Sequence, residues 1–331
     1  MPVNDLKFLI IGLGSMGKRR IRNLLFNNIS KDNIFGFNPT VGRCQEVENE
    51  YGIKTYIDFD EAEKITPDVY IICTPPLSHH EYFLHAAKNK KHFFVEVTTN
   101  NVGYDELKPV LDGSFVAAPS CTFRYFPAVK KIKELLLSGI IGNPLSFNHY
   151  LGQYLPDWHP YEDYRKVYFA QKETGGAREM FPYELVWLTD IFTSSVKNVQ
   201  GLRGKISDLE MTADDIYGAL VQLENGVVGN MQIDILNRKA CRTLKIVGTD
   251  GTIDWDWLGK KIEIYSAKSK SSEIIDLVEG KKVGQYNTGE DAYEAEIADF
   301  LKAIAGEKKF PYTFVEDDKI LQCLNSFADI K

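Results

Sequence analysis

The segment "IIGLGSMGKRRIRNLL", residues 10–25, constrains the fold of this chain more than any other. An apolar run leads into three glycines spaced G-x-G-x-x-G, and an amphipathic helix pattern follows. In that setting the first glycine permits a tight turn, the second lets the backbone approach a pyrophosphate, and the third lets the helix pack on the strand. The segment therefore predicts a dinucleotide-binding turn. Its cofactor-binding residues are expected to be Gly12, Gly14, Ser15, Met16 and Gly17.

The first 120 residues alternate between strand-like and helical patterns. Several of the strand-like runs are apolar on successive residues, as in strands that helices cover on both faces. This pattern predicts a doubly wound parallel sheet of the Rossmann type. The expected strands are residues 7–13, 33–38, 53–58, 68–74, 92–97 and 114–120.

After this region the pattern changes to longer alternating strands joined by short glycine turns. Asn225-Gly226 and Asp250-Gly251 each separate two strand-like runs, and both dipeptides favour the positive-φ turn of a hairpin. Near the end, an apolar helix pattern over residues 297–304 stops before a glycine. The chain is thus expected to combine an α/β Rossmann domain, residues 1–121, with an α+β domain, residues 122–331, that holds a large, open, mostly antiparallel sheet.

The composition argues against several classes of protein. A net charge of −7, without a basic run that could neutralise a string of phosphates, argues against nucleic-acid binding. No apolar segment reaches membrane-spanning length, and the N-terminus shows no basic leader or cleavage site. The five cysteines are widely spaced, so neither a disulfide framework nor a metal site is expected. These features predict a cytoplasmic protein with no membrane, nucleic-acid or metal partner.

The end of the second expected strand bears on the choice between NAD and NADP. An acid there would receive the ribose hydroxyls of NAD, but the chain has Asn38, which does not repel a 2′-phosphate. Arg43 is close enough in sequence to meet such a phosphate, and Lys18, Arg19 and Arg20 are expected to add positive charge nearby. Alternatively, Arg43 is a solvated helix residue, and the choice of cofactor stays open.

Further motifs follow the glycine turn in order. The segment "CTPPLSHHEYFLHAAKNKKHFFVEV" has the layout T-P-x-x-x-H-x-E, then a helix and a buried strand that ends in an acid. "CTFRYFPAV", a Tyr-Arg pair before "TGGA", and "LENGVVGNMQ" with "VGTDGTIDW" continue the series. Together they resemble the Gfo/Idh/MocA family of glucose-fructose oxidoreductase and inositol dehydrogenase relatives over nearly the whole chain. The resemblance implies a nicotinamide cofactor that also contacts Thr74, Pro75, His79 and Glu96.

The catalytic signature of that family is altered in this chain. Where the family has E-K-P, whose lysine relays a proton, the chain has Glu96-Val97-Thr98. The Asp and His that follow G-G-A in the family are replaced by Met180 and Glu184. The resemblance places Glu96 near the nicotinamide, where it would position the cofactor. Alternatively, Glu96 is a strand-end acid that caps a neighbouring helix.

Residues 151–185 hold the densest group of polar side chains, interleaved with aromatic rings. This mixture suits sugars, because rings stack on pyranose faces while charged groups hold hydroxyls. The arginines favour an anionic sugar, although each could equally form a surface salt bridge. The expected substrate-binding residues are Arg124, Asp157, Trp158, Tyr164, Arg165, Arg178 and Glu179.

A group in the same segment is expected to take the hydroxyl proton as hydride leaves. His159 has a near-neutral intrinsic pKa, Glu184 could serve if burial raised its pKa, and Tyr183 is a third candidate. Alternatively, His159 is a surface or packing residue, Glu184 pairs with Arg178 or Lys172, and Tyr183 belongs to the core.

Two functions follow from these features. The first is an NAD(P)-dependent oxidoreductase that transfers hydride to or from a sugar, sugar acid, cyclitol or nucleotide-linked sugar through an atypical proton relay. The alternative is a redox-inactive sensor or scaffold that binds a dinucleotide and a sugar. A broad single sheet must cover its outer face, so a homodimer or homotetramer is also expected. The sequence names neither the substrate nor the reaction direction.

Overall fold

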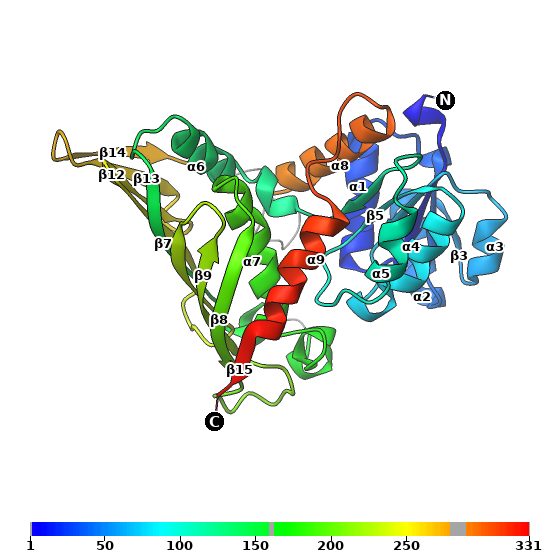
Figure 1. Cartoon of the computed structure of the whole chain (residues 1–331). Coiled ribbons are helices and arrows are strands. Elements are labelled where there is room, and N and C mark those ends of the chain that lie inside the picture. The colour runs from blue at the N-terminus through cyan, green and yellow to red at the C-terminus, as the bar shows by residue number, and fades with distance from the viewer. Residues whose placement is uncertain (1, 159–161, 279–288, 331) are drawn as a thin grey trace. The chain divides into compact units, whose positions relative to one another are not determined.

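The chain divides into two compact units in a computed structural model that describes residues 2–158, 162–278 and 289–330 (Figure 1). The first unit comprises Met1–Thr122 and Val283–Asp318, and the second comprises Phe123–Lys282 and Lys319–Lys331. The sequence predicts a single crossing after residue 121, whereas the structure also returns residues 283–318 to the first unit. Helix α9 (Phe314–Gln322) contains the last crossing.

The first unit contains one parallel sheet, with strands β1 (Phe8–Ile11), β2 (Ile34–Phe37), β3 (Lys54–Tyr56), β4 (Val69–Ile72), β5 (His92–Val95) and β6 (Ala117–Pro119). All six expected strands therefore form. Their order is β3-β2-β1-β4-β5-β6. Every residue of the central strands β1 and β4 is buried, which explains their unbroken apolar sequence. The predicted Rossmann sheet is confirmed.

The helices of the first unit are α1 (Ser15–Phe26), α2 (Val41–Tyr51), α3 (Phe59–Glu63), α4 (His79–Lys88), α5 (Tyr104–Leu107) and α8 (Asp291–Ile304). They cover both faces of the sheet. On one face an ion pair between Lys18 and Glu46 joins α1 to α2, and α8 packs beside α1. On the other face the ring of Phe59 contacts Tyr82, which joins α3 to α4. Helix α8 is the one that the pattern over residues 297–304 predicts.

The second unit holds a nine-stranded sheet, with strands β7 (Pro144–Gly152), β8 (Val196–Gly204), β9 (Ile216–Leu223), β10 (Val228–Asp234), β11 (Cys241–Gly248), β12 (Gly251–Asp256), β13 (Lys261–Ser266), β14 (Ser271–Asp276) and β15 (Phe327–Asp329). Its order is β14-β13-β12-β11-β7-β10-β9-β8-β15, and only β7–β10 and β8–β15 pair in parallel among the described strands. The predicted open, mostly antiparallel sheet is confirmed. Two helices accompany it, α6 (Pro127–Leu137) and α7 (Ala177–Ile191), and α7 packs on β9 and β10.

Both predicted hairpins form in this sheet, β9–β10 and β11–β12. Gly226 has a φ of +92°, as the Asn225-Gly226 turn predicts. Gly251 is different, because it begins β12 without a positive φ. A Cβ on Gly251 would lie 2.1 Å from the carbonyl oxygen of Tyr265. Glycine is thus needed at this position because β13 approaches the backbone closely. The prediction of a positive φ at Gly251 is wrong.

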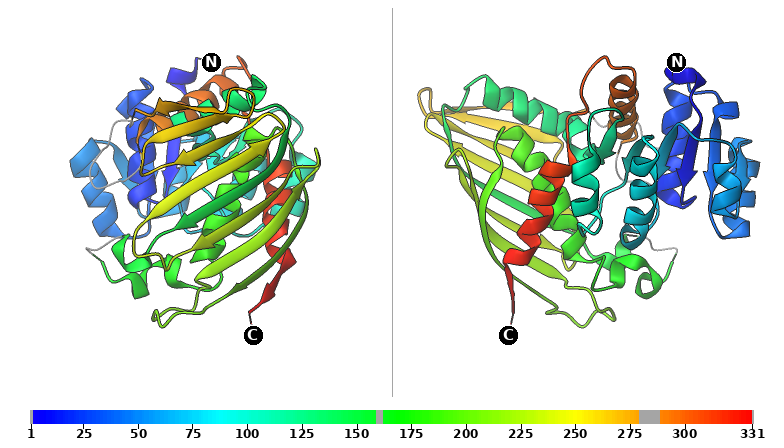
Figure 2. Two further views of the ribbon diagram at one scale, coloured as in Figure 1. Left: turned by 90° about the vertical axis from the view of Figure 1, so that its left-hand side faces the viewer. Right: turned by 45° about the vertical axis from the view of Figure 1, so that its right-hand side comes forward.

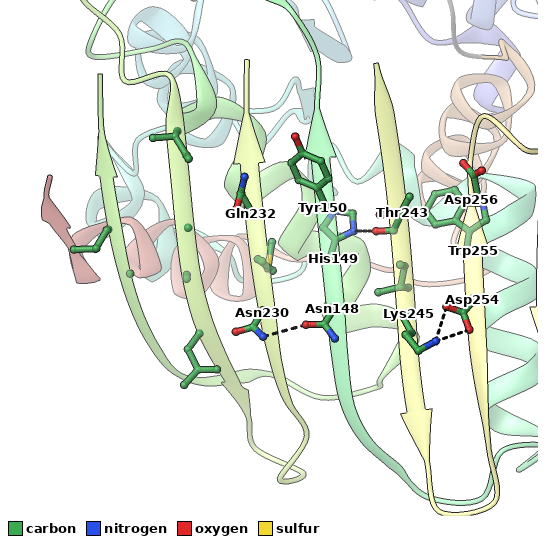
Figure 3. Close-up of a pocket in the computed structure, with 18 of the residues that line it drawn as sticks. Asn148, His149, Tyr150, Asn230, Gln232, Thr243, Lys245, Asp254, Trp255 and Asp256 are labelled. Atoms are coloured by element: carbon green, nitrogen blue, oxygen red, sulfur yellow. Dashed lines mark hydrogen bonds and ion pairs between the residues drawn. The ribbon is translucent and has the colours of Figure 1, made fainter. Parts of the chain in front are cut away.

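The face of the nine-stranded sheet turned away from α7 is open within the second unit (Figure 2). It forms a hollow of about 1290 Å³, across which Asn148 and Asn230 are joined by a hydrogen bond of 3.0 Å and Lys245 pairs with Asp254 at 3.0 Å (Figure 3). None of the residues that the sequence predicts to bind cofactor or substrate is among those that line it. Within the described ranges, no helix has the length and apolar character needed to cross a membrane.

Candidate dinucleotide site and acid–base groups

The glycine turn between β1 and α1 is built for close backbone contact. A Cβ on Gly12, whose φ is +91°, would lie 2.7 Å from the Cys73 carbonyl oxygen, and one on Gly17 would lie 2.0 Å from the Gly12 carbonyl oxygen. Gly14 is the N-cap of α1, so no side chain there caps the first N–H groups of the helix. This helix end therefore suits an anionic pyrophosphate. The other predicted residues of the turn, on the first turn of α1, are Ser15 and Met16.

Two buried polar atoms just beyond β4, Oγ1 of Thr74 and Nδ1 of His79, have no hydrogen-bond partner among the described residues. Nδ1 of the neighbouring His80 is a third such atom. Nε2 of His79 lies 2.7 Å from the Thr74 carbonyl oxygen and donates to it, which leaves Nδ1 as an acceptor. Burial lowers the pKa of His79 to about 4, although that carbonyl opposes the shift, so the ring is neutral at pH 7. Because buried polar atoms without partners are costly, the pair fits a ligand that supplies one donor and one acceptor, as a dinucleotide does.

Two residues at or after the end of β2, Asn38 and Arg43, bear on whether the site accepts the 2′-phosphate that distinguishes NADP from NAD. Asn38 is buried, and its Oδ1 accepts the backbone N–H of Thr40 at 2.9 Å, so its amide N–H groups remain as donors. Arg43 is exposed on α2. A Cβ placed on Gly14 would lie 3.2 Å from Nη1 of Arg43, so the guanidinium lies beside the glycine turn. Of the acids that the structure describes, none forms an ion pair with it.

The basic run after the turn is bound to acids of the protein. Lys18 pairs with Glu46 and Glu50, and Nε of Arg19 lies 3.2 Å from Oε2 of Glu290, which is buried. The positive charge that this run was expected to add near the cofactor is therefore balanced by acids of the protein. Periodicity alone could not find these partners, because Arg19 and Glu290 are 271 positions apart in sequence.

Arg20 explains the acid at the end of β5. Its Nε lies 2.6 Å from Oε1 of Glu96 and its Nη2 lies 2.9 Å from Oε2 of Glu296, with the Arg20 side chain fully buried. Burial acts to lower the pKa of Arg20, but the two carboxylates outweigh it and the net shift is upward. Glu96 is thus the partner of a buried cation, and it caps no helix among the described residues. The sequence offered one signal, since Arg20 falls four residues before the buried Leu24 on the apolar side of α1.

Glu184 lies on α7 with no exposed surface and accepts three hydrogen bonds. The donors are Nη2 of Arg242 at 2.8 Å, Nε2 of His149 at 2.9 Å and the indole N–H of Trp187 at 2.9 Å. Burial acts to raise the pKa of Glu184, but Arg242 and then His149 outweigh it, and the net shift is downward. The upward pKa shift that a relay role for Glu184 would require is therefore not found, and the alternative of a pair with Arg178 or Lys172 is wrong. The carboxylate joins α7 to β7 and β11.

Three other positions bear on the acid–base chemistry: Tyr183, His159 and Met180. The ring of Tyr183 contacts Phe123 edge-on, with ring centroids 5.2 Å apart. His159 lies outside the described residues. Met180, where the family has an acid, packs against an apolar cluster formed by Leu155, Phe169, Leu209 and Ile235.

Glu179 has an environment unlike that of Glu184. Its Oε1 accepts the hydroxyl of Tyr168 at 3.1 Å, while its Oε2 is buried and has no partner in the described part of the chain. Burial raises the pKa of Glu179 to about 8, although the bond from Tyr168 opposes the shift. A carboxyl of this kind holds a proton near neutral pH.

The remaining residues predicted to bind substrate lie in several settings. Arg165 is half-exposed and paired with Asp163 and Glu210, each at 2.8 Å. Nε of Arg124 donates to the Val186 carbonyl oxygen at 3.2 Å. These guanidinium groups are already engaged by the protein. The other residues of the set comprise an exposed Asp157, a half-buried Arg178, a Tyr164 whose hydroxyl accepts the Glu210 N–H at 3.1 Å, and a Trp158 whose ring centroid lies 4.3 Å from that of Phe169.

Comparison with known proteins assigns both parts of the chain to one family. Residues 6–100 match the model described as "Oxidoreductase family, NAD-binding Rossmann fold", and residues 129–254 match the model of the GFO/IDH/MocA C-terminal domain. The chain is 24% identical over 294 residues to the scyllo-inositol 2-dehydrogenase (NAD(+)) of Bacillus subtilis, covering 82% of this chain and 80% of that protein.

Solved structures agree in fold. A levoglucosan dehydrogenase, in complex with NADH and levoglucosan, superposes with a TM-score of 0.80 at 18% identity, covering 97% of this chain and 95% of that one. The UDP-N-acetylglucosamine 3-dehydrogenase of Acidithiobacillus ferrooxidans gives 0.76 at 20% identity, covering 97% and 96%. At these identities the likeness concerns the fold. The two family matches carry the assignment and confirm the predicted nicotinamide dinucleotide as the type of cofactor. The chain belongs to the Gfo/Idh/MocA oxidoreductase family, whose first domain is an NAD-binding Rossmann fold.

Proposed function

We propose that this protein is an NADP(H)-preferring oxidoreductase that moves hydride between a carbinol carbon of a sugar, cyclitol or nucleotide-linked sugar and the nicotinamide ring. The observation that carries the proposal is the β1–α1 turn with the partnerless atoms of Thr74 and His79 beside it, in a chain of this family. The relatives named above are dehydrogenases of an inositol, an anhydrosugar and a nucleotide sugar.

Within this proposal the first unit holds the cofactor. The start of α1 binds the pyrophosphate, and Asn38 and Arg43 bind the adenosine end. Thr74 and His79 form hydrogen bonds to the cofactor with the atoms that have no partner among the described residues. Glu96, fixed by Arg20, stays proposed as a group that positions the cofactor. The bound nicotinamide accepts or donates the hydride. The second unit provides the sugar-binding residues, for which the segment 151–185 remains the candidate.

The proposal is tested with the purified full-length protein. Binding of NAD⁺, NADH, NADP⁺ and NADPH is measured by titration, and turnover is followed by nicotinamide absorbance with scyllo-inositol, levoglucosan, UDP-N-acetylglucosamine, free sugars and uronic acids. We expect binding of a reduced dinucleotide and oxidation of at least one polyol or sugar. Failure of all four dinucleotides to bind would remove the proposal.

The preference for NADP(H) is tested at Arg43. Arg43→Ala is expected to weaken NADPH binding by about 10-fold or more and to change NADH binding little, because a charge-assisted hydrogen bond contributes about 1.5–3 kcal/mol. Lys88→Ala removes an exposed cation of the same unit far along the sequence and should leave both affinities unchanged. Equal affinity of the unaltered protein for NADH and NADPH would contradict the preference.

A sensor or scaffold is the second candidate function. It is favoured by Val97, which cannot transfer a proton, and by Met180, which is packed into an apolar cluster. This function predicts dinucleotide binding without turnover of any compound in the same panel. The cytoplasmic location and the dimeric or tetrameric state stay predictions, and light scattering of the purified protein tests the second.

A further inference from the structure

A proton relay must offer a titratable group with an atom that the protein leaves free for substrate. Within the described part of segment 151–185, two acids fail this condition. Asp163 is bound by the Arg165 side chain, whose hydrogen bond lowers its pKa. Glu184 is enclosed by three donors.

Glu179 meets the condition and also has a route to solvent. Its Oε2 is buried without a partner among the described residues, and its Oε1 accepts the Tyr168 hydroxyl at 3.1 Å. The Tyr168 side chain is 45% exposed. The hydrogen bond therefore links the carboxyl, whose Oε2 is buried, to a partly exposed side chain.

A tight turn before α7 holds these two side chains in place. The backbone N–H of Gly176 donates to the Phe169 carbonyl oxygen at 2.7 Å. A Cβ on Gly175 would lie 2.0 Å from that same oxygen, and one on Gly176, whose φ is +66°, would lie 2.3 Å from the Asp214 carbonyl oxygen. Only glycine permits this packing at both positions. The turn thus fixes the start of α7, which carries Glu179, against the short 3-10 helix that carries Tyr168.

We propose that Glu179 is the acid–base group of the reaction proposed above, on which this inference rests, and that Tyr168 passes the proton to solvent. In the oxidation direction, the carbinol C–H bond breaks and hydride leaves with both electrons for the oxidised nicotinamide. The O–H bond breaks, its proton joins Oε2 of Glu179, and the C=O bond forms. In reduction the protonated carboxyl returns the proton to the new hydroxyl.

The protonation behaviour of Glu179 agrees with this role. Burial raises its pKa to about 8, and the hydrogen bond from Tyr168 opposes the shift. Among the described titratable groups, Tyr168 is the one whose interaction changes the pKa of Glu179. Because the pKa is close to neutral, both the acid and the base form are populated where an enzyme of this kind works.

The test compares kcat over about pH 6–10 for the full-length protein, Glu179→Gln, Tyr168→Phe and the control Glu173→Gln, an exposed acid of the preceding loop. For oxidation, kcat of the unaltered protein should rise with an apparent pKa near 8. Glu179→Gln should lower kcat by about 10²- to 10⁴-fold, abolish this pH dependence and leave NADPH affinity unchanged. Tyr168→Phe should move the rise to higher pH, because its hydroxyl lowers the pKa of Glu179. The control should match the unaltered protein.

The outcomes separate this inference from the proposed function. Turnover that survives Glu179→Gln with its pH profile intact overturns the inference alone. Absence of turnover by the unaltered protein with every compound of the panel overturns the proposed function and the inference together. Should Glu179→Gln fail to fold, the Tyr168→Phe profile decides, and a profile identical to that of the unaltered protein counts against the relay.

Discussion

Replacing Arg20 by Met is expected to lower the free energy of unfolding of the first unit by about 3–5 kcal/mol. The substitution removes the guanidinium that lies 2.6 Å from Glu96 and 2.9 Å from Glu296, so two largely buried carboxylates lose their shared cation. Denaturant unfolding followed by far-ultraviolet circular dichroism measures the loss. Tryptophan fluorescence gives an internal reference, because all 4 tryptophans lie in the second unit.

Lys18→Met is the matched control for Arg20→Met. It removes a cation from the same helix, but its partner Glu46 is 58% exposed, and such a surface pair contributes about 0–1 kcal/mol. A loss for Arg20→Met no larger than that of the control would show that the buried cluster is not needed for stability.

The effect of Arg20→Met also has a predicted pH dependence. Without the guanidinium, burial holds the folded-state pKa of Glu296 further above its unfolded value of about 4.3 than in the unaltered protein. A protonated carboxyl needs no cation, so the destabilisation should be small near pH 4 and grow as the pH rises. The same unfolding experiment at about pH 5 and about pH 8 checks the sign. A destabilisation that shrinks with rising pH would contradict the account.

Glu184→Gln is expected to lower the free energy of unfolding of the second unit by about 3–5 kcal/mol. The amide keeps the shape of the side chain, but the Arg242 guanidinium, 4% exposed, loses its counter-ion. Trp187 donates to this carboxylate, so tryptophan fluorescence reports the transition directly. The exposed Glu173→Gln is the control and should change stability by less than about 0.5 kcal/mol.

The destabilisation by Glu184→Gln should also grow as the pH rises, although the folded-state pKa of the carboxyl concerned is lowered here and raised in the case of Arg20→Met. The folded-state pKa of Glu184 is lowered, so its contribution is complete above the unfolded value of about 4.3 and is lost as the pH falls through the folded value. Stabilities of the unaltered protein and Glu184→Gln should therefore converge in acid. If Glu184→Gln instead kept full stability and lost turnover, Glu184 would be a relay group and the structural assignment would be wrong.

Most of the fold could be predicted because it depends on short-range patterns. The unbroken apolar runs of β1 and β4 predicted strands buried on both faces, and the spacing of Gly12, Gly14 and Gly17 predicted the β1–α1 turn. The turn at Gly226 was predicted for the same reason, since a positive φ is a property of one residue and its neighbours. At Gly251 the same rule failed, because that glycine is required by a contact with Tyr265 on the next strand.

Only the tertiary structure determines which charged side chains form ion pairs. The basic run after the glycine turn was expected to add positive charge near the cofactor, but Arg20 pairs with acids 76 and 276 positions away. Glu184 was expected to serve as a relay only if burial raised its pKa, but Arg242, 58 positions away, keeps that pKa low. Glu179, nearer the start of the same helix, has no such cation in the described part of the chain, and burial raises its pKa. Local sequence sets backbone geometry and burial, whereas a carboxyl's protonation depends on which distant side chains the fold brings within a few ångströms.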